Sequence, residues 1–203
     1  MELDVIFEDG KKSAHVQAVF DERADADLEV IENAVNKSLY TCNSSGYRRR
    51  DFEALLREIG LGVILIVHQH SGFGGNQKKR SLGNASSEGP KLYAVEYIDA
   101  LEFNKPTVQG ILRSELKELS LPPRVLIGSD CHDWSCYPKH DSKSEMPKAF
   151  CAQIKSLPTF RGLLLALTAP ETRIGVSEPQ VRPSFVESIE IAGEVVPMNP
   201  GIN

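Results

Sequence analysis

Two short apolar runs in this chain each stop at residues with metal-binding side chains. The run 63–67 is followed by His68 and His70, and the run 125–127 is followed by the segment Gly-Ser-Asp-Cys-His at 128–132. Continuous apolar runs of this length predict strands that are buried on both faces, as in parallel sheets covered by helices. Catalytic groups in such proteins lie just beyond the carboxyl ends of the strands. The two runs therefore predict an α/β fold with an enzyme-like metal site at one edge of its sheet.

The composition is that of an ordinary globular protein. The chain has 203 residues, 41% hydrophobic and 25% charged, which is enough for one large domain or one domain and a tail. Its apolar runs are far shorter than the roughly 18 residues of a membrane span, and its first residues lack a secretion-signal pattern. The four cysteines are spread along the chain, which favours reduced thiols over a disulfide framework. We therefore expect a cytoplasmic protein that does not enter a membrane.

The net charge of −5 argues against a generally basic nucleic-acid binder, but two cationic clusters interrupt the acidic background. These clusters are Arg-Arg-Arg at 48–50 and Lys-Lys-Arg at 78–80. A run of three cations is more often a solvated face than a phosphate contact. The second cluster lies in the loop after His68, which we expect to overhang the site, and this location slightly favours a phosphate contact.

Turn signals and apolar periodicity divide the chain into alternating elements. An Asp-Gly turn at 8–11 joins strands at 2–7 and 14–20 into a hairpin. Helical spacing of apolar residues predicts helices at 25–39, 51–59, 107–119 and 160–167. Short apolar runs predict strands at 62–67, 97–103 and 124–127. The segment 70–90 is rich in Gly, Ser, Asn and Lys and predicts a long loop. The last residues predict a small β-hairpin around Gly193.

Five side chains at predicted strands or strand ends form a candidate metal site. They are two carboxylates and three imidazoles: Glu2, His15, His68, Asp130 and His132. Asp130 and His132 are the strongest pair, because one residue between them on an extended segment points both side chains to the same face. His68 and His70 share that spacing, and His68 is preferred because it directly ends the apolar run. His68, Asp130 and His132 are also the candidate catalytic residues.

The ligand types indicate both the metal and the reaction. Mixed nitrogen and oxygen ligands favour zinc, manganese or iron over calcium. Such ions hydrolyse phosphate esters, because one ion lowers the pKa of a water while another neutralises charge on the leaving oxygen. A lone histidine such as His15 is more often a structural side chain, so its interpretation depends on its neighbours. Cys131 and Cys136 lack a second pair at zinc-binding spacing and are interpreted as inert thiols.

The order of these residues resembles the later motifs of the PHP family, the polymerase-and-histidinol-phosphatase metal-dependent phosphoesterases. The resemblance rests on Glu2-Leu3, His15-Val16, Val67-His68-Gln69 and, most specifically, the segment 128–132. Two further stretches, Ile-Asp-Ala-Leu-Glu-Phe at 98–103 and Leu-Pro-Thr-Phe-Arg-Gly-Leu at 157–163, resemble the TrlF-like branch. In that branch a PHP domain precedes an ATPase related to those of SMC and RecF proteins.

The resemblance implies a partial, distorted β/α barrel with divalent Zn, Mn or Fe at its carboxyl face, followed by a small carboxyl-terminal β segment. It implies that Glu2 is a bridging carboxylate and that His15, His68, Asp130 and His132 are metal ligands. The family's opening His-x-His and Asp-His motifs have no counterpart here. We therefore expect residues 1–175 to be the carboxyl-terminal part of a PHP-like domain. We expect residues 176–203 to be a linker and the start of an ATPase domain that lies outside the chain.

Three functional hypotheses follow. The first is a metal-dependent phosphoesterase within a longer PHP-plus-ATPase protein, with a phosphate ester as substrate and nucleic acid as one candidate. On this hypothesis the isolated chain binds metal weakly and turns over little substrate. The second is a non-catalytic PHP-like regulatory or scaffolding module with an incomplete metal site, which contacts a linked or separate ATPase. The third is an unrelated α/β binding domain whose histidines are structural.

Overall fold

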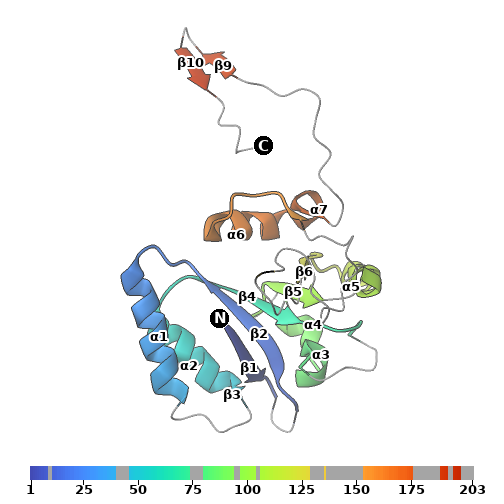
Figure 1. The fold of residues 1–203 in the computed structure, drawn as a ribbon. Helices are drawn as coiled ribbons and strands as arrows, with labels where there is room; N and C mark the ends of the chain where they lie inside the picture. Colours follow the sequence, from blue (N-terminus) through green and yellow to red (C-terminus); the bar gives the residue numbers. More distant parts are fainter. Residues whose placement is uncertain are drawn as a thin grey trace.

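A six-stranded sheet forms the centre of an α/β fold (Figure 1). The computed structural model describes residues 1–8, 11–39, 46–73, 80–93, 97–103, 106–128, 135, 153–175, 188–191 and 194–197. The sheet has the strand order β3-β1-β2-β4-β5-β6. Its strands are β1 (Glu2–Ile6), β2 (Ala14–Phe20), β3 (Tyr47–Arg48), β4 (Val63–His68), β5 (Ala100–Phe103) and β6 (Val125–Ile127).

The strand directions bring most strand ends to one edge of the sheet. Strand β2 is antiparallel to both of its neighbours, β1 and β4, whereas β3 is parallel to β1 and β5 is parallel to both β4 and β6. The carboxyl ends of β1, β3, β4, β5 and β6 therefore lie at the same edge, next to the amino end of β2. We call this edge the carboxyl edge. The two apolar runs are parallel strands, as their composition predicts, with β5 between them.

Five helices supply apolar side chains to the larger core on one face of the sheet. They are α1 (Asp25–Leu39), α2 (Arg49–Ile59), α3 (Leu82–Ala85), α4 (Gly89–Leu92) and α5 (Pro106–Glu118). Helix α2 shows how the sequence specifies this packing, because Phe52, Leu55 and Ile59 are buried at helical spacing. The helix ends at Gly60, whose φ of 70° is left-handed and whose N–H donates to the Leu56 carbonyl.

The opposite face of the sheet carries a smaller apolar cluster under α6 (Phe160–Thr168) and α7 (Pro170–Arg173). Ile64 and Ile66 of β4 pack there with Ala166 and Leu167 of α6, whereas Leu65 and Val67 of β4 point into the larger core. This alternation is the period of two that a strand imposes on its side chains. In Figure 1, α6 accordingly lies on the other side of the sheet from α1 and α2.

The segment 70–90 differs from its sequence prediction. Where we expect one long loop, the structure places α3 and the start of α4. Leu82, Ala85 and Leu92 are buried, so a few apolar side chains anchor the polar segment to the main core. Two smaller pairs complete the described elements: β7 (Gln153–Ile154) with β8 (Ile174–Gly175), and the predicted hairpin as β9 (Ser188–Ile191) with β10 (Glu194–Pro197). Within the described ranges, no helix combines the length and apolarity that crossing a membrane requires.

Candidate functional site

One face of the sheet carries a group of polar side chains from four neighbouring strands, which we call the polar face. Its members are Glu2, Asp4, His15, Gln17, His68 and Glu102. The register pairs Glu2 with Gln17, Asp4 with His15, and His68 with Glu102. Paired residues point to the same side of a sheet, so these side chains share the face that carries Ile64 and Ile66. The polar face therefore lies beside the apolar cluster under α6, toward the carboxyl edge.

His15 lies between two carboxylates. Its Nδ1 atom is 3.0 Å from Glu2 Oε1, and its Nε2 atom is 3.3 Å from Asp4 Oδ1. The Ser13 hydroxyl donates to the same Asp4 oxygen at 3.1 Å, which helps to orient that carboxylate. The His15 backbone N–H donates to the Arg80 carbonyl at 3.0 Å. The structure thus brings together Glu2 and His15, two of the predicted ligands, and adds Asp4 to them.

His68 forms the second contact centre of the polar face. Its Nδ1 atom is 3.4 Å from Glu102 Oε2, and its Nε2 atom is 3.2 Å from His70 Nδ1. The His68 and Glu102 side chains are only 15% and 17% exposed, whereas those of His15 and Glu2 are 25% and 53% exposed. A hydrogen bond between these two atoms requires a proton on His68 Nδ1, because an ionised carboxylate only accepts hydrogen bonds. In that tautomer the Nε2 lone pair faces His70 Nδ1.

The remaining predicted ligands, Asp130 and His132, lie outside the described residues. Their segment starts at Gly128, whose N–H donates to the Phe103 carbonyl of β5 at 3.3 Å. The chain therefore leaves β6 beside Glu102, at the carboxyl edge where β4 ends on His68. In the part of the chain that the structure describes, no three His, Cys, Asp or Glu side chains are grouped so that they could hold a metal ion.

A half-buried carboxylate, Asp99, fixes the spacing of β4 and β5 below the polar face. It accepts a hydrogen bond from the Leu65 N–H at 2.8 Å, and its own N–H donates to the Leu65 carbonyl at 2.9 Å. Burial raises the pKa of Asp99 above its ordinary value, although the Leu65 hydrogen bond and the Arg124 charge oppose that rise. Asp99 thus supports the strand pair that carries His68 and Glu102.

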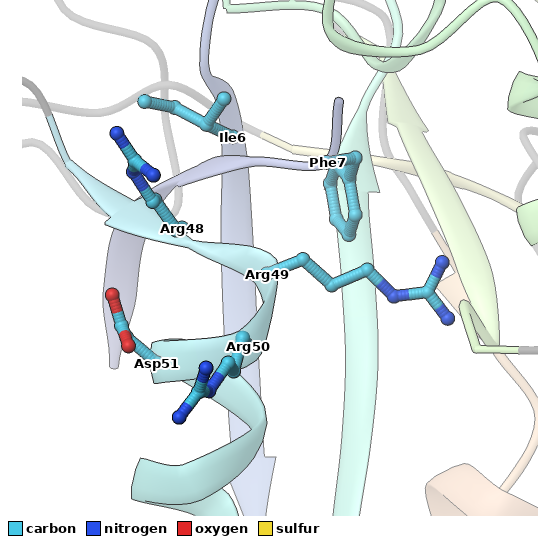
Figure 2. A pocket seen from close by; sticks show the side chains of 6 residues that line it. All are labelled: Ile6, Phe7, Arg48, Arg49, Arg50 and Asp51. Atoms are coloured by element: carbon cyan, nitrogen blue, oxygen red, sulfur yellow. The ribbon is translucent and has the colours of Figure 1, made fainter. Parts of the chain in front are cut away.

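The arginine run lines a separate pocket of about 500 Å³ between the end of β1 and the start of α2 (Figure 2). The three guanidinium groups diverge: Arg48 lies near Ile6, while Arg49 extends under Phe7 and away from Arg48. Arg49 is paired with Glu53 at 2.9 Å and lies 5.3 Å from the Tyr97 ring centroid. The three guanidinium groups therefore do not converge on one point, and Arg49 is engaged with Glu53 and Tyr97.

The second cationic cluster is described only at Arg80, because 78 and 79 lie outside the described residues. The Arg80 backbone forms an isolated parallel bridge with Ala14, next to His15. Its φ of 65° lies in the left-handed region, which a non-glycine residue seldom adopts. The chain is therefore back at the sheet, beside His15, when it reaches Arg80.

Sequence reasoning did not identify Asp4, Gln17 and Glu102 as site residues. Each lies two residues from, or directly opposite, a predicted ligand, so each shares its face. The available signal was a polar residue at the site-facing position of an otherwise apolar strand, as in the Ala-Leu-Glu-Phe sequence of β5. Period-two alternation can therefore find such residues once one ligand on the face is known.

Comparison with known proteins provides no further identification. No family model matches the chain, and neither curated proteins nor solved structures gave a match.

Proposed function

We propose that this chain carries the site of a metal-dependent phosphoesterase. The observation that supports the proposal is the polar face, where imidazoles and carboxylates of four neighbouring strands gather beside the start of the Gly-Ser-Asp-Cys-His segment. Buried or half-buried titratable groups at the carboxyl ends of parallel strands are typical of α/β active sites. The substrate class is a phosphate ester or diester, with nucleic acid as one candidate.

The donor set fits a divalent Zn, Mn or Fe ion. Glu2, His15 and His68, together with Asp130 and His132, would hold it, since imidazole and carboxylate are the ligands that these ions prefer. Each contact joins one pair of side chains, His15 with Glu2 at 3.0 Å and His68 with Glu102 at 3.4 Å. The described residues group no three such side chains, so Asp130 and His132 would have to complete the ligand set. When bound, the metal would supply Lewis-acid chemistry for hydrolysis. The protein groups would orient the site and exclude bulk water around His68.

The finer architecture and context belong to the same proposal. For the partial β/α barrel, the supporting observations are the parallel strands β4, β5 and β6 and the position of α1–α5 on one face of the sheet. The polar side chains lie on the other face, which α6 and α7 cover in part. The PHP resemblance adds a linked or separate ATPase partner to the proposal. A cytoplasmic location is proposed from the sequence, which has neither a secretion-signal pattern nor an apolar run long enough to span a membrane.

Hydrolysis of bis(p-nitrophenyl) phosphate tests the proposed reaction. The purified chain is assayed with Mn²⁺, Zn²⁺ or Fe²⁺, beside His68→Ala and, as a control, Glu32→Ala on the exposed side of α1. We expect slow hydrolysis that needs the metal and falls by about 100-fold or more in His68→Ala, while Glu32→Ala keeps the wild-type rate. Hydrolysis that resists chelation, or that is equal in His68→Ala, would contradict the proposal.

A second candidate function is a non-catalytic PHP-like regulatory or scaffolding module. It is favoured by one observation: both ring nitrogens of His15 and both of His68 already contact protein atoms. Imidazoles with these contacts could stabilise the sheet without binding a metal. Stoichiometric metal binding without hydrolysis would support this second function.

A further inference from the structure

We propose that Glu102 is a positioning residue of this site. Its carboxylate fixes the His68 imidazole in the Nδ1–H tautomer and thereby offers Nε2 as the ligand atom. The inference rests on the proposed metal site, but it concerns a residue that neither the motifs nor the resemblance assigns to that site. It starts from the contacts of one half-buried carboxylate with side chains and backbone of three neighbouring segments.

Glu102 lies at the centre of these contacts. It is paired in register with His68 of β4 and with Leu126 of β6. Its Oε2 atom accepts a hydrogen bond from Gln17 Nε2 at 2.9 Å, across β4, and lies 3.4 Å from His68 Nδ1. Gln17 thus orients the same oxygen that faces His68. A carboxylate that is this buried is expensive to leave unpaired, so its partners are functionally or structurally important.

The second carboxylate oxygen lies against Gly128, the residue that follows β6. A Cβ atom on Gly128 would lie 1.8 Å from Glu102 Oε1, far inside any allowed contact. Positive φ angles occur at Gly46 and Gly60 among the described glycines and not at Gly128. A side chain at 128 would therefore act through space, by displacing the end of the Glu102 side chain. The Glu102 carboxylate therefore packs against the backbone from which the segment with Asp130 departs. Glu102 thus contacts both His68 at the end of β4 and Gly128, which precedes the segment with the proposed ligands Asp130 and His132.

This arrangement matches how proteins control metal-binding histidines. A histidine ligand commonly donates its other ring N–H to a carboxylate, which fixes the tautomer and raises the basicity of the ligating nitrogen. His68 has this pattern, with Nδ1 toward Glu102 and Nε2 toward His70. His70 Nδ1 lies 3.2 Å from His68 Nε2, the atom that would ligate the metal. Glu102 would thus prepare His68, whereas His70 would compete for the same nitrogen.

Imidazole ¹⁵N chemical shifts of the metal-free protein test the positioning role directly. Long-range ¹H–¹⁵N spectra are recorded at one alkaline pH for wild type, Glu102→Ala and Glu102→Gln. We expect wild-type His68 as the Nδ1–H tautomer, a mixture of both tautomers in Glu102→Ala, and partial retention in Glu102→Gln, whose amide oxygen can still accept. An unchanged His68 tautomer in Glu102→Ala would overturn the inference.

A pair of glycine variants gives an independent perturbation that leaves Glu102 in place. Gly128→Ala pushes a methyl group into the carboxylate, whereas Gly175→Ala adds the same methyl group where no atom lies within 4 Å. We expect Gly128→Ala to change the His68 tautomer as Glu102→Ala does, and Gly175→Ala to leave it unchanged. Far-ultraviolet circular dichroism and urea midpoints show whether each variant is folded. The same His68 spectrum in both glycine variants would count against the inference.

Titration calorimetry with Zn²⁺ alone links the tautomer to the site. We expect Zn²⁺ to bind about 10- to 100-fold more weakly to Glu102→Ala than to wild type, with Glu102→Gln in between. Equal affinity of Glu102→Ala and wild type would overturn the positioning role. If wild type binds no Zn²⁺, the proposed function fails, while the His68 tautomer still decides whether Glu102 positions the imidazole.

Discussion

At the residue scale, we expect alanine to change the stability of the protein in opposite directions at Gly60, directly after α2, and at Gly110, within α5. Gly60 ends α2 with a φ of 70°, and its Cβ would meet nothing closer than the Arg57 carbonyl at 3.8 Å. The left-handed backbone alone therefore penalises alanine, by about 1 kcal/mol. Gly110 lies within α5, where a Cβ would have no atom within 4 Å. There alanine should stabilise by roughly 0.5–1 kcal/mol through higher helix propensity.

Urea unfolding of the Gly60→Ala and Gly110→Ala variants measures both free energies against wild type. Each variant is the control for the other, because the chemical change is identical. The same sign of change in both variants would contradict the assigned backbone conformations.

Asp99 provides a second residue-scale prediction, through Asp99→Asn. Burial raises the pKa of Asp99 above its ordinary value of 3.8, so the folded protein holds the proton more tightly than the unfolded chain does. Wild-type stability contributed by this group therefore falls as the pH rises from 3.8 through the raised folded pKa. Asparagine keeps an acceptor for the Leu65 N–H and does not ionise. We expect the variant to gain stability relative to wild type between about pH 3 and about pH 7.

Urea unfolding of wild type and Asp99→Asn at several pH values measures this relative gain. A stability difference that does not vary with pH would show that the Asp99 carboxyl titrates alike in the folded and unfolded states.

At the element scale, Glu8 ties the segment between α3 and α4 to the end of β1. Its carboxylate accepts hydrogen bonds from the Ser86 hydroxyl at 2.7 Å and from the Ser87 N–H and hydroxyl, both at 2.9 Å. These bonds, led by the Ser86 hydroxyl, lower the pKa of Glu8 below its ordinary value of 4.5. The stabilisation is therefore fully present above pH 4.5 and is lost as the pH falls through the lower folded pKa.

Glu8→Gln should loosen this attachment at neutral pH. We expect faster amide exchange across 86–93 in the variant than in wild type, with the difference shrinking in acid. Hydrogen exchange followed by mass spectrometry measures it. Glu88→Gln is the matched control, because exposed Glu88 pairs only weakly, with Lys91 at 3.5 Å. Equal exchange in wild type and Glu8→Gln would show that Glu8 does not hold the segment.

The elements themselves were largely predictable because each has a local signal. The helix at 25–39 and the strand at 14–20 match their predictions residue for residue, and Gly60 ends α2 as its sequence position indicates. The helices within 70–90 were missed, because their few apolar anchors, such as Leu82, gain their effect from distant core residues. The site was found only in part for the same reason: Gln17 and Glu102 are 85 residues apart and meet only in the folded sheet.

At the scale of the whole molecule, the two faces of one sheet serve different purposes. One face is apolar and packs against helices, which supplies the main core. The other face is apolar under α6 and titratable toward the carboxyl edge, where His15, His68 and Glu102 lie beside the start of the segment with Asp130 and His132. Beyond α6 this face is partly exposed, and its imidazoles and carboxylates lie in contact with one another. The proposed function is therefore assigned to the polar face.

Metal content is the most direct test of that conclusion. Inductively coupled plasma mass spectrometry would be run on the purified chain in equilibrium dialysis against excess Zn²⁺, Mn²⁺ or Fe²⁺, with the metal of the dialysate subtracted, so that weakly bound metal is also counted. The variants are an Asp130→Ala and His132→Ala double variant, His15→Ala, and Glu32→Ala as a control. We predict stoichiometric metal in wild type and Glu32→Ala, and its loss from the double variant and from His15→Ala. Wild type without bound metal, or equal metal in all four proteins, would contradict the assignment of the polar face as a metal site.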